Sequence, residues 1–222
     1  DPHGSPSEIS RVMLISGTSR GIGKFLAEHY LSRGFHVVGC SRSAVTLDSS
    51  RYTHFELDVS DESKVREMFS WIRKNLGRLD YLLNNAAINP AIAPVLLMPI
   101  SAVQKAFEVN FLGTYLLSRE AAKLMGRRSF GRIVNFSSMA AHHHVAGEAA
   151  YTASKAAVVA FSKVFAKEVH RQGITCNVLA PAAIPTELSA AVNAEALDEV
   201  LRRNAIPAFG KFEDVSATVD FL

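Results

Sequence analysis

Short apolar runs alternate along the chain with longer stretches in which apolar residues recur every three or four positions. The first pattern is typical of buried β-strands and the second of amphipathic helices. Strands are predicted over Arg11–Ser16, Phe35–Cys40, Tyr52–Leu57, Leu79–Leu83, Arg132–Phe136 and Ile174–Leu179. Helices are predicted over Gly21–Arg33, Ser60–Leu76, Ser101–Met125, Ala149–Arg171 and Ala190–Asn204. This alternation implies βαβ units, so we expect an α/β fold with a mostly parallel, doubly wound sheet and helices on both faces.

Capping signals mark the start of two predicted helices. Ser60 has a side chain suited to cap the helix that ends near Leu76. Pro99 and Ser101 open the long helix to Met125, and Gln104 completes the spacing of a capping box with Ser101. We therefore expect Ser60 and Ser101 to act as N-caps.

The first ten residues differ from the rest of the chain. They are polar and include Pro2, Gly4 and Pro6, which predicts a flexible arm over residues 1–10. The alternating pattern then continues without a linker or repeat, so residues 11–222 are expected to form one domain.

Composition excludes several classes of protein. Hydrophobic residues make up 48% of the chain and charged residues 20%, which is ordinary for a globular protein and not for a disordered one. No apolar run approaches the ~18 residues that span a membrane, and no signal peptide opens the chain. The two cysteines, Cys40 and Cys176, each lie inside an apolar run, which favours buried free thiols over a disulfide. Free thiols fit a reducing compartment, so we expect a cytoplasmic protein.

The charge balance bears on possible partners. The chain has 24 Lys and Arg residues against 21 Asp and Glu, a net charge of +3, and the two signs are interspersed. A protein that binds nucleic acid usually carries a concentrated basic surface, so nucleic acid is not an expected partner.

A glycine-rich turn, Ser16–Gly23, joins the first predicted strand to the first helix. It fails as a P-loop, because five residues separate Gly17 from Gly23 and Phe25 follows Lys24 where Ser or Thr is needed. It formally matches a nucleophile elbow around Ser19, for which Asp80 with His144 or His170 could complete a hydrolase triad. As a dinucleotide loop, Gly17 allows the tight turn, Gly21 the approach of pyrophosphate, and Gly23 close packing of the helix.

A second motif carries acid–base chemistry. Tyr151 and Lys155 are four residues apart on a predicted helix and so share one face. An ammonium at that distance lowers a phenol pKa from its reference value near ~10, which would let Tyr151 exchange protons with a carbonyl oxygen. Ser138 follows the fifth predicted strand, where ligands of open α/β sheets bind, and its hydroxyl can stabilise a developing alkoxide.

Together with Asn84–Ala87 and Asn110, these residues resemble the short-chain dehydrogenase/reductase family, in particular its 3-oxoacyl-carrier-protein reductases. The resemblance runs from about Val12 to the end of the chain. It implies a Rossmann fold with strand order 3-2-1-4-5-6-7 and a catalytic set of Asn110, Ser138, Tyr151 and Lys155. In that set Lys155 also holds the nicotinamide ribose, and Asn110 positions a water that relays protons to Lys155.

The same resemblance implies the cofactor contacts. They fall on Gly17, Ser19, Arg20, Gly21, Ile22, Gly23, Ser41, Arg42, Asp58, Val59, Asn85, Ala86, Ala87, Tyr151, Lys155, Pro181, Ile184 and Thr186. Two positions depart from the family pattern, since Ala87 and Ala182 stand where glycine is usual. Alanine disfavours positive φ, so the resemblance leaves the local backbone geometry open at these two positions but not the chemistry.

The second predicted strand indicates which cofactor is used. An NAD site wants a carboxylate at its end, but no acidic residue follows Cys40 until Asp48. Arg42 stands where a guanidinium can reach a 2′-phosphate, and Arg20 in the glycine turn can approach from the other side. We therefore expect NADP(H).

Three further groups of residues allow both a functional and a purely structural interpretation. Three consecutive histidines, His142–His144, would point in different directions in an extended loop, so no metal site is expected, and they line a substrate pocket or a solvated loop. Arg127, Arg128 and Arg171 could dock an acidic carrier protein or simply be solvated. The segment Glu187–Asn204 is rich in Ala and Leu, which suggests an apolar pocket wall.

The sequence thus predicts an NADP(H)-dependent ketoreductase that acts on 3-oxoacyl or related small carbonyl substrates, either free or bound to a carrier. The alternatives are a dinucleotide sensor without turnover and, less favoured, the Ser19 hydrolase. The chain stops at Leu222, before the family's seventh strand. We expect a homodimer or homotetramer formed through the helices over Ser101–Met125 and Ala149–Arg171.

Overall fold

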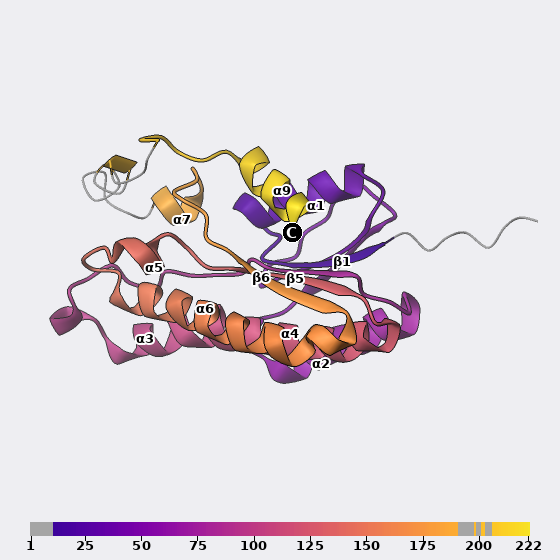
Figure 1. The fold of residues 1–222 in the computed structure, drawn as a ribbon. Helices are drawn as coiled ribbons and strands as arrows, with labels where there is room; N and C mark the ends of the chain where they lie inside the picture. The colour runs from indigo at the N-terminus through magenta and orange to yellow at the C-terminus, as the bar shows by residue number, and fades with distance from the viewer. Residues whose placement is uncertain (1–10, 191–197, 199–200, 203–205) are drawn as a thin grey trace, which may run out of the picture.

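A computed structural model describes residues 11–190, 198, 201–202 and 206–222, so the predicted arm over residues 1–10 lies outside it. At its centre is a sheet of parallel strands in the order β3-β2-β1-β4-β5-β6 (Figure 1). The strands are β1 (Val12–Ser16), β2 (His36–Ser41), β3 (Tyr52–Glu56), β4 (Tyr81–Asn84), β5 (Gly131–Phe136) and β6 (Ile174–Leu179). The predicted α/β fold class is confirmed, and the order agrees with the first six strands that the family resemblance implied.

Helices cover both faces of the sheet (Figure 1). They are α1 (Gly21–Ser32), α2 (Glu62–Asn75), α3 (Ile100–Ala106), α4 (Gly113–Met125), α5 (Ala140–His143), α6 (Ala149–Val169), α7 (Glu187–Ala190) and α9 (Phe212–Phe221). Shorter turns are η1 (Val95–Leu97), the π-helix η2 (Phe107–Leu112), η3 (Gly126–Arg128) and η4 (His170–Gln172). The helix predicted over 190–204 falls mainly outside the described residues.

Two apolar clusters hold these layers together. One lies between the sheet and α2, α4 and α6, and contains the free thiols Cys40 and Cys176. The other lies between the sheet and α1 and α9, around Leu26 and Val219. Because helices cover both faces, every residue of β1 is buried, which explains why its sequence is continuously apolar rather than alternating.

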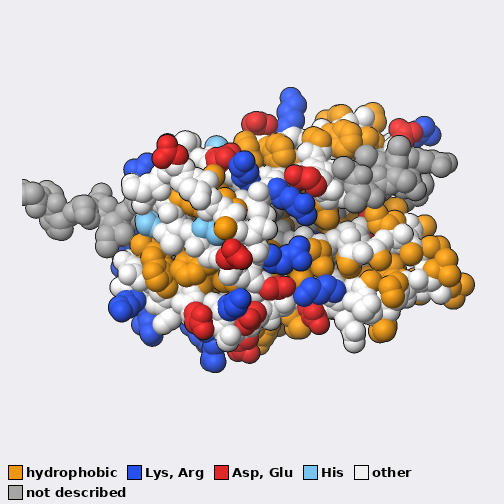
Figure 2. Space-filling model, turned by 180° about the vertical axis from the view of Figure 1, so that it is seen from behind, with side chains coloured by type: hydrophobic (Ala, Val, Ile, Leu, Met, Phe, Trp, Pro, Cys, Tyr) orange, Lys and Arg blue, Asp and Glu red, His pale blue; other side chains and the backbone are white. Residues whose placement is uncertain are grey.

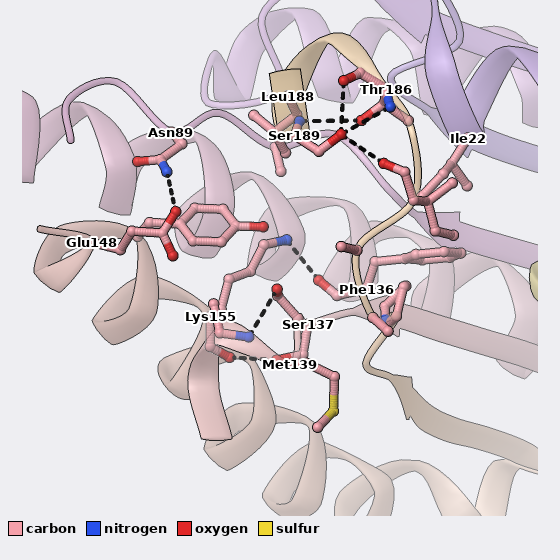
Figure 3. Close-up of a pocket in the computed structure, with 18 of the residues that line it drawn as sticks. Ile22, Asn89, Phe136, Ser137, Met139, Glu148, Lys155, Thr186, Leu188 and Ser189 are labelled. Carbon is pink, nitrogen blue, oxygen red and sulfur yellow. Dashed lines mark hydrogen bonds between the residues drawn. The ribbon is translucent and has the colours of Figure 1, made fainter. Parts of the chain in front are cut away.

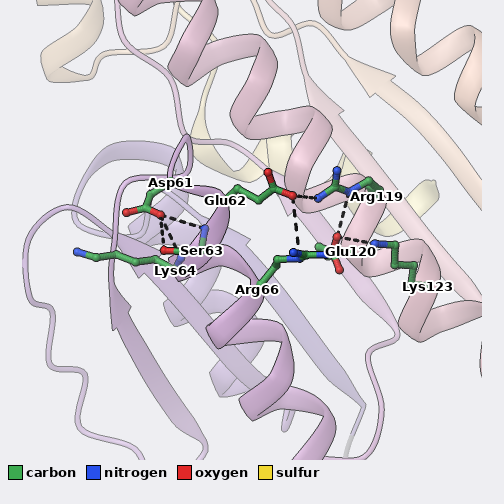
Figure 4. Close-up of polar contacts among 8 residues, drawn as sticks. All are labelled: Asp61, Glu62, Ser63, Lys64, Arg66, Arg119, Glu120 and Lys123. Carbon is green, nitrogen blue, oxygen red and sulfur yellow. Dashed lines mark hydrogen bonds and ion pairs between the residues drawn. The ribbon is translucent and has the colours of Figure 1, made fainter.

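The cap of α2 differs from the prediction (Figure 4). Asp61, not Ser60, is the N-cap, and its carboxylate accepts hydrogen bonds from the backbone N–H groups of Ser63 and Lys64 at 3.0 and 3.2 Å. Ser60 instead donates from its hydroxyl to Asp58 at 2.6 Å. An ionised carboxylate suits the positive end of the helix better than a hydroxyl, which accounts for the shift by one residue.

The predicted long helix is also interrupted. Its N-cap is Pro99 without a side-chain cap, and Ser101 lies inside the first turn, so the expected capping box with Gln104 does not form. Between α3 and α4 the chain widens into the π-helix η2, which contains Asn110. Such π segments are frequent at functional sites.

Charged side chains are spread over the surface. Arg119 of α4 bonds Glu62 of α2 at 2.7 Å and Glu120 at 3.0 Å, and Lys123 bonds Glu120 at 2.7 Å (Figure 4). Figure 2 shows blue and red side chains interspersed over one face. No described helix has the length and apolar character needed to span a membrane.

Candidate functional site

Two cavities adjoin at the carboxyl ends of the strands, where open α/β sheets bind ligands. The larger, here the glycine-loop cavity, has a volume of ≈520 Å³. The smaller, here the Tyr151 pocket, has a volume of ≈170 Å³ and is shown in Figure 3. Both are lined by Ile22, Asn85, Ala87, Thr186 and Leu188, so the two spaces meet at these residues.

Most of the predicted cofactor contacts line the glycine-loop cavity. They are Gly17, Ser19, Arg20, Gly21, Ile22, Ser41, Arg42, Asp58, Val59, Asn85, Ala86, Ala87 and Thr186. The Tyr151 pocket takes Tyr151, Lys155, Pro181 and Ile184. Gly23 borders neither cavity, so the structure separates it from the other predicted contacts.

The glycines of the turn have distinct tasks. Gly17 (φ +78°) donates its N–H to Cys40 O at 2.7 Å, and Gly21 also has a positive φ of +55°. A Cβ on Gly23 would lie 2.2 Å from Gly17 O, far inside contact distance. Gly23 therefore acts through packing of α1 against the turn, as its spacing predicted, and not as part of the cavity wall.

Side chains outside the predicted set fix the shape of the turn. Ser16 Oγ accepts hydrogen bonds from the N–H groups of Asn85 and Ala86 at 3.1 and 3.0 Å, which ties the end of β1 to the end of β4. Tyr52 donates to Thr18 Oγ1 at 3.1 Å. Sequence reasoning missed Ser16 and Tyr52, although a hydroxyl at the end of a wholly apolar strand was a usable signal.

The start of α1 suits an anion. Its N-cap, Arg20, makes no side-chain cap bond, and its first turn holds no acidic residue, so free N–H groups face the cavity. The exposed guanidinium groups of Arg20 and Arg42 border the same space, and no acidic residue that the structure describes forms an ion pair with either. The donor set fits a dinucleotide phosphate.

Asp58 lies in the wall of the glycine-loop cavity. Its carboxylate accepts hydrogen bonds from Ser60 and from Lys105 Nζ at 3.3 Å. Burial raises the pKa of this carboxyl, but the hydrogen bonds from Ser60 and Lys105 outweigh burial and lower it overall. Asp58 is therefore ionised and held in place at neutral pH.

The Tyr151 pocket joins α6 to the segment after β5 (Figure 3). Tyr151 and Lys155 come from α6, and Ser138 follows β5 and lines the same space. Lys155 is 2% exposed, and its Nζ donates to Phe136 O at 2.7 Å. The three side chains therefore meet in one cavity, as their spacing predicted.

The predicted pKa of Tyr151 was wrong in direction for this structure. Burial raises the pKa of the phenol to about 12, with a further increase from the charge of Glu148 and a decrease from a hydrogen bond with Ser138. Lys155 Nζ is turned to Phe136 O and lies 5.9 Å from the centre of the Tyr151 ring. Burial also lowers the pKa of Lys155 to about 8, so the ammonium is itself poorly stabilised.

Asn110 lies outside both cavities. It is fully buried, and its Oδ1 accepts from Ile88 N at 2.8 Å while its Nδ2 donates to Ile88 O and Ser154 Oγ, each at 2.9 Å. Ser154 belongs to α6, beside Lys155. Asn110 thus connects the segment after β4 to the helix that carries Tyr151.

The two alanines that replace family glycines cause no backbone strain. Among the described non-glycine residues, only Ser129 and His144 have positive φ. Ala87 and Ala182 therefore lie outside the left-handed region, so alanine carries no φ penalty at either position.

The histidine segment is not the extended loop that was expected. Ser138 Oγ accepts from Ala140 N, and the chain turns into α5, with His144 in a left-handed conformation at its end. His142 and His144 are exposed, whereas His143 lines the Tyr151 pocket. Within the described residues no group of three His, Cys, Asp or Glu side chains could hold a metal.

The Ser19 hydrolase hypothesis fails on position. Asp80 precedes β4 at the amino edge of the sheet, where it bonds Arg78 and Val12 N, so it cannot serve a triad with Ser19 at the carboxyl edge. Arg127, Arg128 and Arg171 lie in η3 and η4, before β5 and β6. That is also the amino edge, so these arginines lie at the opposite end of the strands from the Tyr151 pocket of the same chain.

Known proteins are similar to this chain in sequence. The short chain dehydrogenase family profile matches residues 11–197. The 3-oxoacyl-[acyl-carrier-protein] reductase FabG of Haemophilus influenzae is 32% identical over 220 residues, covering 96% of this chain and 90% of that protein. Carbonyl reductase family member 4 of Xenopus laevis is 32% identical over 219 residues, with 96% and 91% covered.

Two solved structures are similar to this chain in fold. The structure described as ElxO with NADP bound has a TM-score of 0.87 at 32% identity, covering 96% of this chain and 91% of that one. 4-hydroxyisoleucine dehydrogenase complexed with NADH has a TM-score of 0.84 at 27% identity, with 96% and 90% covered. By sequence and by fold, this chain belongs to the short-chain dehydrogenase/reductase family of oxidoreductases.

Proposed function

We propose that this protein is an NADP(H)-dependent ketoreductase that interconverts a small carbonyl compound and its secondary alcohol. The observation that carries the proposal is the meeting of Tyr151, Ser138 and Lys155 in a pocket that opens onto the glycine-loop cavity. The similarity to 3-oxoacyl-carrier-protein reductases supports 3-oxoacyl or related ketones as substrates.

The glycine-loop cavity supplies the residues for cofactor binding. The N-terminus of α1 would hold the pyrophosphate, and Arg20 and Arg42 would hold the 2′-phosphate. Asp58 and Val59 would border the adenine, and Lys155 the nicotinamide ribose. When bound, the reduced cofactor would supply the hydride.

The pocket residues manage the proton. Because the pKa of Tyr151 is about 12, its phenol is protonated at neutral pH and can donate to the carbonyl oxygen as the carbon accepts hydride. Ser138 would hydrogen-bond the same oxygen as its charge develops. Lys155, with a pKa near 8, is charged at neutral pH and would stabilise the tyrosinate left behind. Asn110, which bonds Ser154 of α6, would position a water that relays protons to Lys155.

The test is NADPH oxidation by the purified protein with a panel of ketones that includes acyl thioesters. Tyr151→Phe should lower kcat by about 10²–10⁴-fold, because it removes the proton donor and keeps the ring. NADPH affinity, measured by fluorescence titration, should stay close to that of the wild type. Tyr81→Phe is the matched control, because Tyr81 lies at the amino end of β4, away from the pocket, where its hydroxyl accepts from Arg11 at 3.1 Å. Near-wild-type turnover by Tyr151→Phe would overturn the assignment.

Binding without turnover would instead favour the alternative, a dinucleotide sensor. In that case NADPH would bind the wild type, yet no ketone in the panel would be reduced. The intact set of Tyr151, Ser138 and Lys155 in one pocket favours the enzyme.

We also propose a homodimer or homotetramer in which copies meet through η2, α4 and α6. Leu112, Tyr115 and Val164 of these elements are 44%, 38% and 57% exposed, which leaves apolar area for a second copy. Sedimentation analysis should give a dimer or tetramer, and Val164→Glu should dissociate it. A monomeric wild type at assay concentration would contradict this part.

A further inference from the structure

One buried carboxyl group has no role in the proposed proton transfer. Glu148 is the residue just before α6, is 7% exposed, and lines the Tyr151 pocket. Its carboxylate accepts a hydrogen bond from Asn89 Nδ2 at 2.9 Å (Figure 3). Among the described residues no Lys or Arg forms an ion pair with it.

Asp80 is a second buried carboxylate, outside the pocket, with which Glu148 can be compared. Asp80 is 2% exposed, but it pairs with the Arg78 guanidinium at 2.7 Å and accepts from Val12 N at 2.8 Å. Within the described part of the chain, the hydrogen-bond partner of the Glu148 carboxylate is the neutral amide of Asn89. A buried carboxylate without a cation is costly to the folded state, so its presence needs a reason other than stability.

The surroundings of Glu148 strengthen its interaction with a ligand. The pocket wall includes Met139, Val145 and Ile184, which keep the local dielectric low. Burial raises the pKa of the Glu148 carboxyl because desolvation penalises its negative charge, and Lys155, the lysine in the same pocket wall, donates to Phe136 O and does not act as its counterion. A positively charged ligand group would supply that counterion.

The position of Glu148 relates it to the reacting carbonyl. Glu148 and Tyr151 are three residues apart and contribute to the same pocket wall, where Cβ atoms at this spacing lie about 5–6 Å apart. A substrate whose carbonyl contacts Tyr151 therefore has room for a charged group a few bonds away, against Glu148.

Building on the proposed function, we propose that Glu148, oriented by Asn89, selects carbonyl and alcohol substrates that carry a protonated amine. The amine donates to the Glu148 carboxylate while the carbonyl or hydroxyl oxygen contacts Tyr151. Glu148 is thus a determinant of substrate specificity.

The experiment compares three alcohols of nearly equal size with NADP⁺: 4-aminobutan-2-ol, pentan-2-ol and butane-1,3-diol. The wild type should show a kcat/KM for the amino alcohol about 10–100-fold above that for pentan-2-ol, the range for a charge-assisted hydrogen bond. Glu148→Gln keeps an oxygen that can accept from Asn89 but removes the charge, and it should abolish most of this ratio. Glu168→Gln, an exposed carboxylate of α6, should keep the ratio.

Calorimetric titration separates failure of this inference from failure of the proposed function. Wild-type protein with NADP⁺ should bind 4-aminobutan-2-ol at least 10-fold more tightly than pentan-2-ol even if no alcohol is oxidised, and this needs no variant to fold. Equal affinities and equal kcat/KM values for the two compounds would overturn the inference. An equal preference for butane-1,3-diol would also overturn it, because a neutral donor would then suffice.

Discussion

The glycine-loop cavity and the Tyr151 pocket adjoin at one edge of the sheet, but different features of the chain shape them. The glycine-loop cavity owes its form to backbone: positive φ at Gly17 and Gly21 and the close approach of Gly23 to Gly17 O. Its charged side chains, Arg20 and Arg42, are exposed. The Tyr151 pocket is formed by side chains, and its titratable groups are buried with shifted pKa values.

The comparison teaches that the two cavities are sensitive to different changes. A cavity made by backbone and exposed cations should respond to steric changes at glycine and to loss of charge. In a pocket made of buried titratable groups, removal of a buried charge should lower activity but raise the free energy of unfolding. Three variants test this difference.

Gly23→Ala should have the largest effect and should act on the glycine-loop cavity. Its Cβ would lie 2.2 Å from Gly17 O, so α1 or the turn must move, at a cost of about 1–3 kcal/mol in the free energy of unfolding. NADPH affinity should fall at least as steeply, because the same turn borders the cavity. Gly210→Ala is the control, since its Cβ would meet Ile184 at an ordinary 3.5 Å. Urea denaturation and NADPH titration of both variants check this, and equal behaviour would show that the turn tolerates a side chain.

Arg42→Ala should change cofactor choice. If NADPH is favoured by about 2 kcal/mol, its KM should be about 30-fold below that of NADH, and the variant should lose most of this ratio. Arg66→Ala, an exposed arginine of α2, should keep it. Steady-state kinetics with both cofactors measure the ratio, and equal use of NADH and NADPH by the wild type would refute the assignment.

Lys155→Met tests the pocket made of buried titratable groups, and its effect on stability should be favourable. Because the folded pKa is about 8 and the ordinary value is 10.5, Lys155 is charged in both states below pH 8, and burying that charge destabilises the folded state. Removing it should raise the free energy of unfolding at pH 7 by about 1–3 kcal/mol while turnover is lost.

The pH dependence distinguishes this cause. Between pH 8 and 10.5 the unfolded wild type binds the extra proton, so wild-type stability from this group rises with pH and the advantage of Lys155→Met disappears. Lys163→Met, an exposed lysine of α6, should show neither effect. Thermal melts across this pH range measure it, and a variant less stable than the wild type at pH 7 would contradict the desolvation argument.

Much of the fold could be predicted from the sequence because its signals are local. Continuous apolar runs gave β1 and β2 to within about one residue, and glycines after helices marked where α1 ends. The errors in the predicted helix starts occurred where neighbouring residues compete for the N-cap position. Asp61 replaced Ser60 as N-cap because a carboxylate is the stronger acceptor at a helix start, and Pro99 placed the start of α3 ahead of Ser101.

The sequence by itself determined the chemistry that depends on spacing. The chain holds a glycine turn between a strand and a helix, and later Tyr151 four residues before Lys155. These motifs indicate dinucleotide binding and acid–base chemistry, because chain geometry fixes which groups are adjacent. Only the tertiary structure decided what burial does to them. Desolvation depends on residues far apart in the chain, such as Phe136, Ser138 and Ile184 around α6, and it raised the pKa of Tyr151 that adjacency alone had predicted to fall. The same packing left Glu148 with Asn89 as its partner, a relation 59 residues long that no local pattern contains.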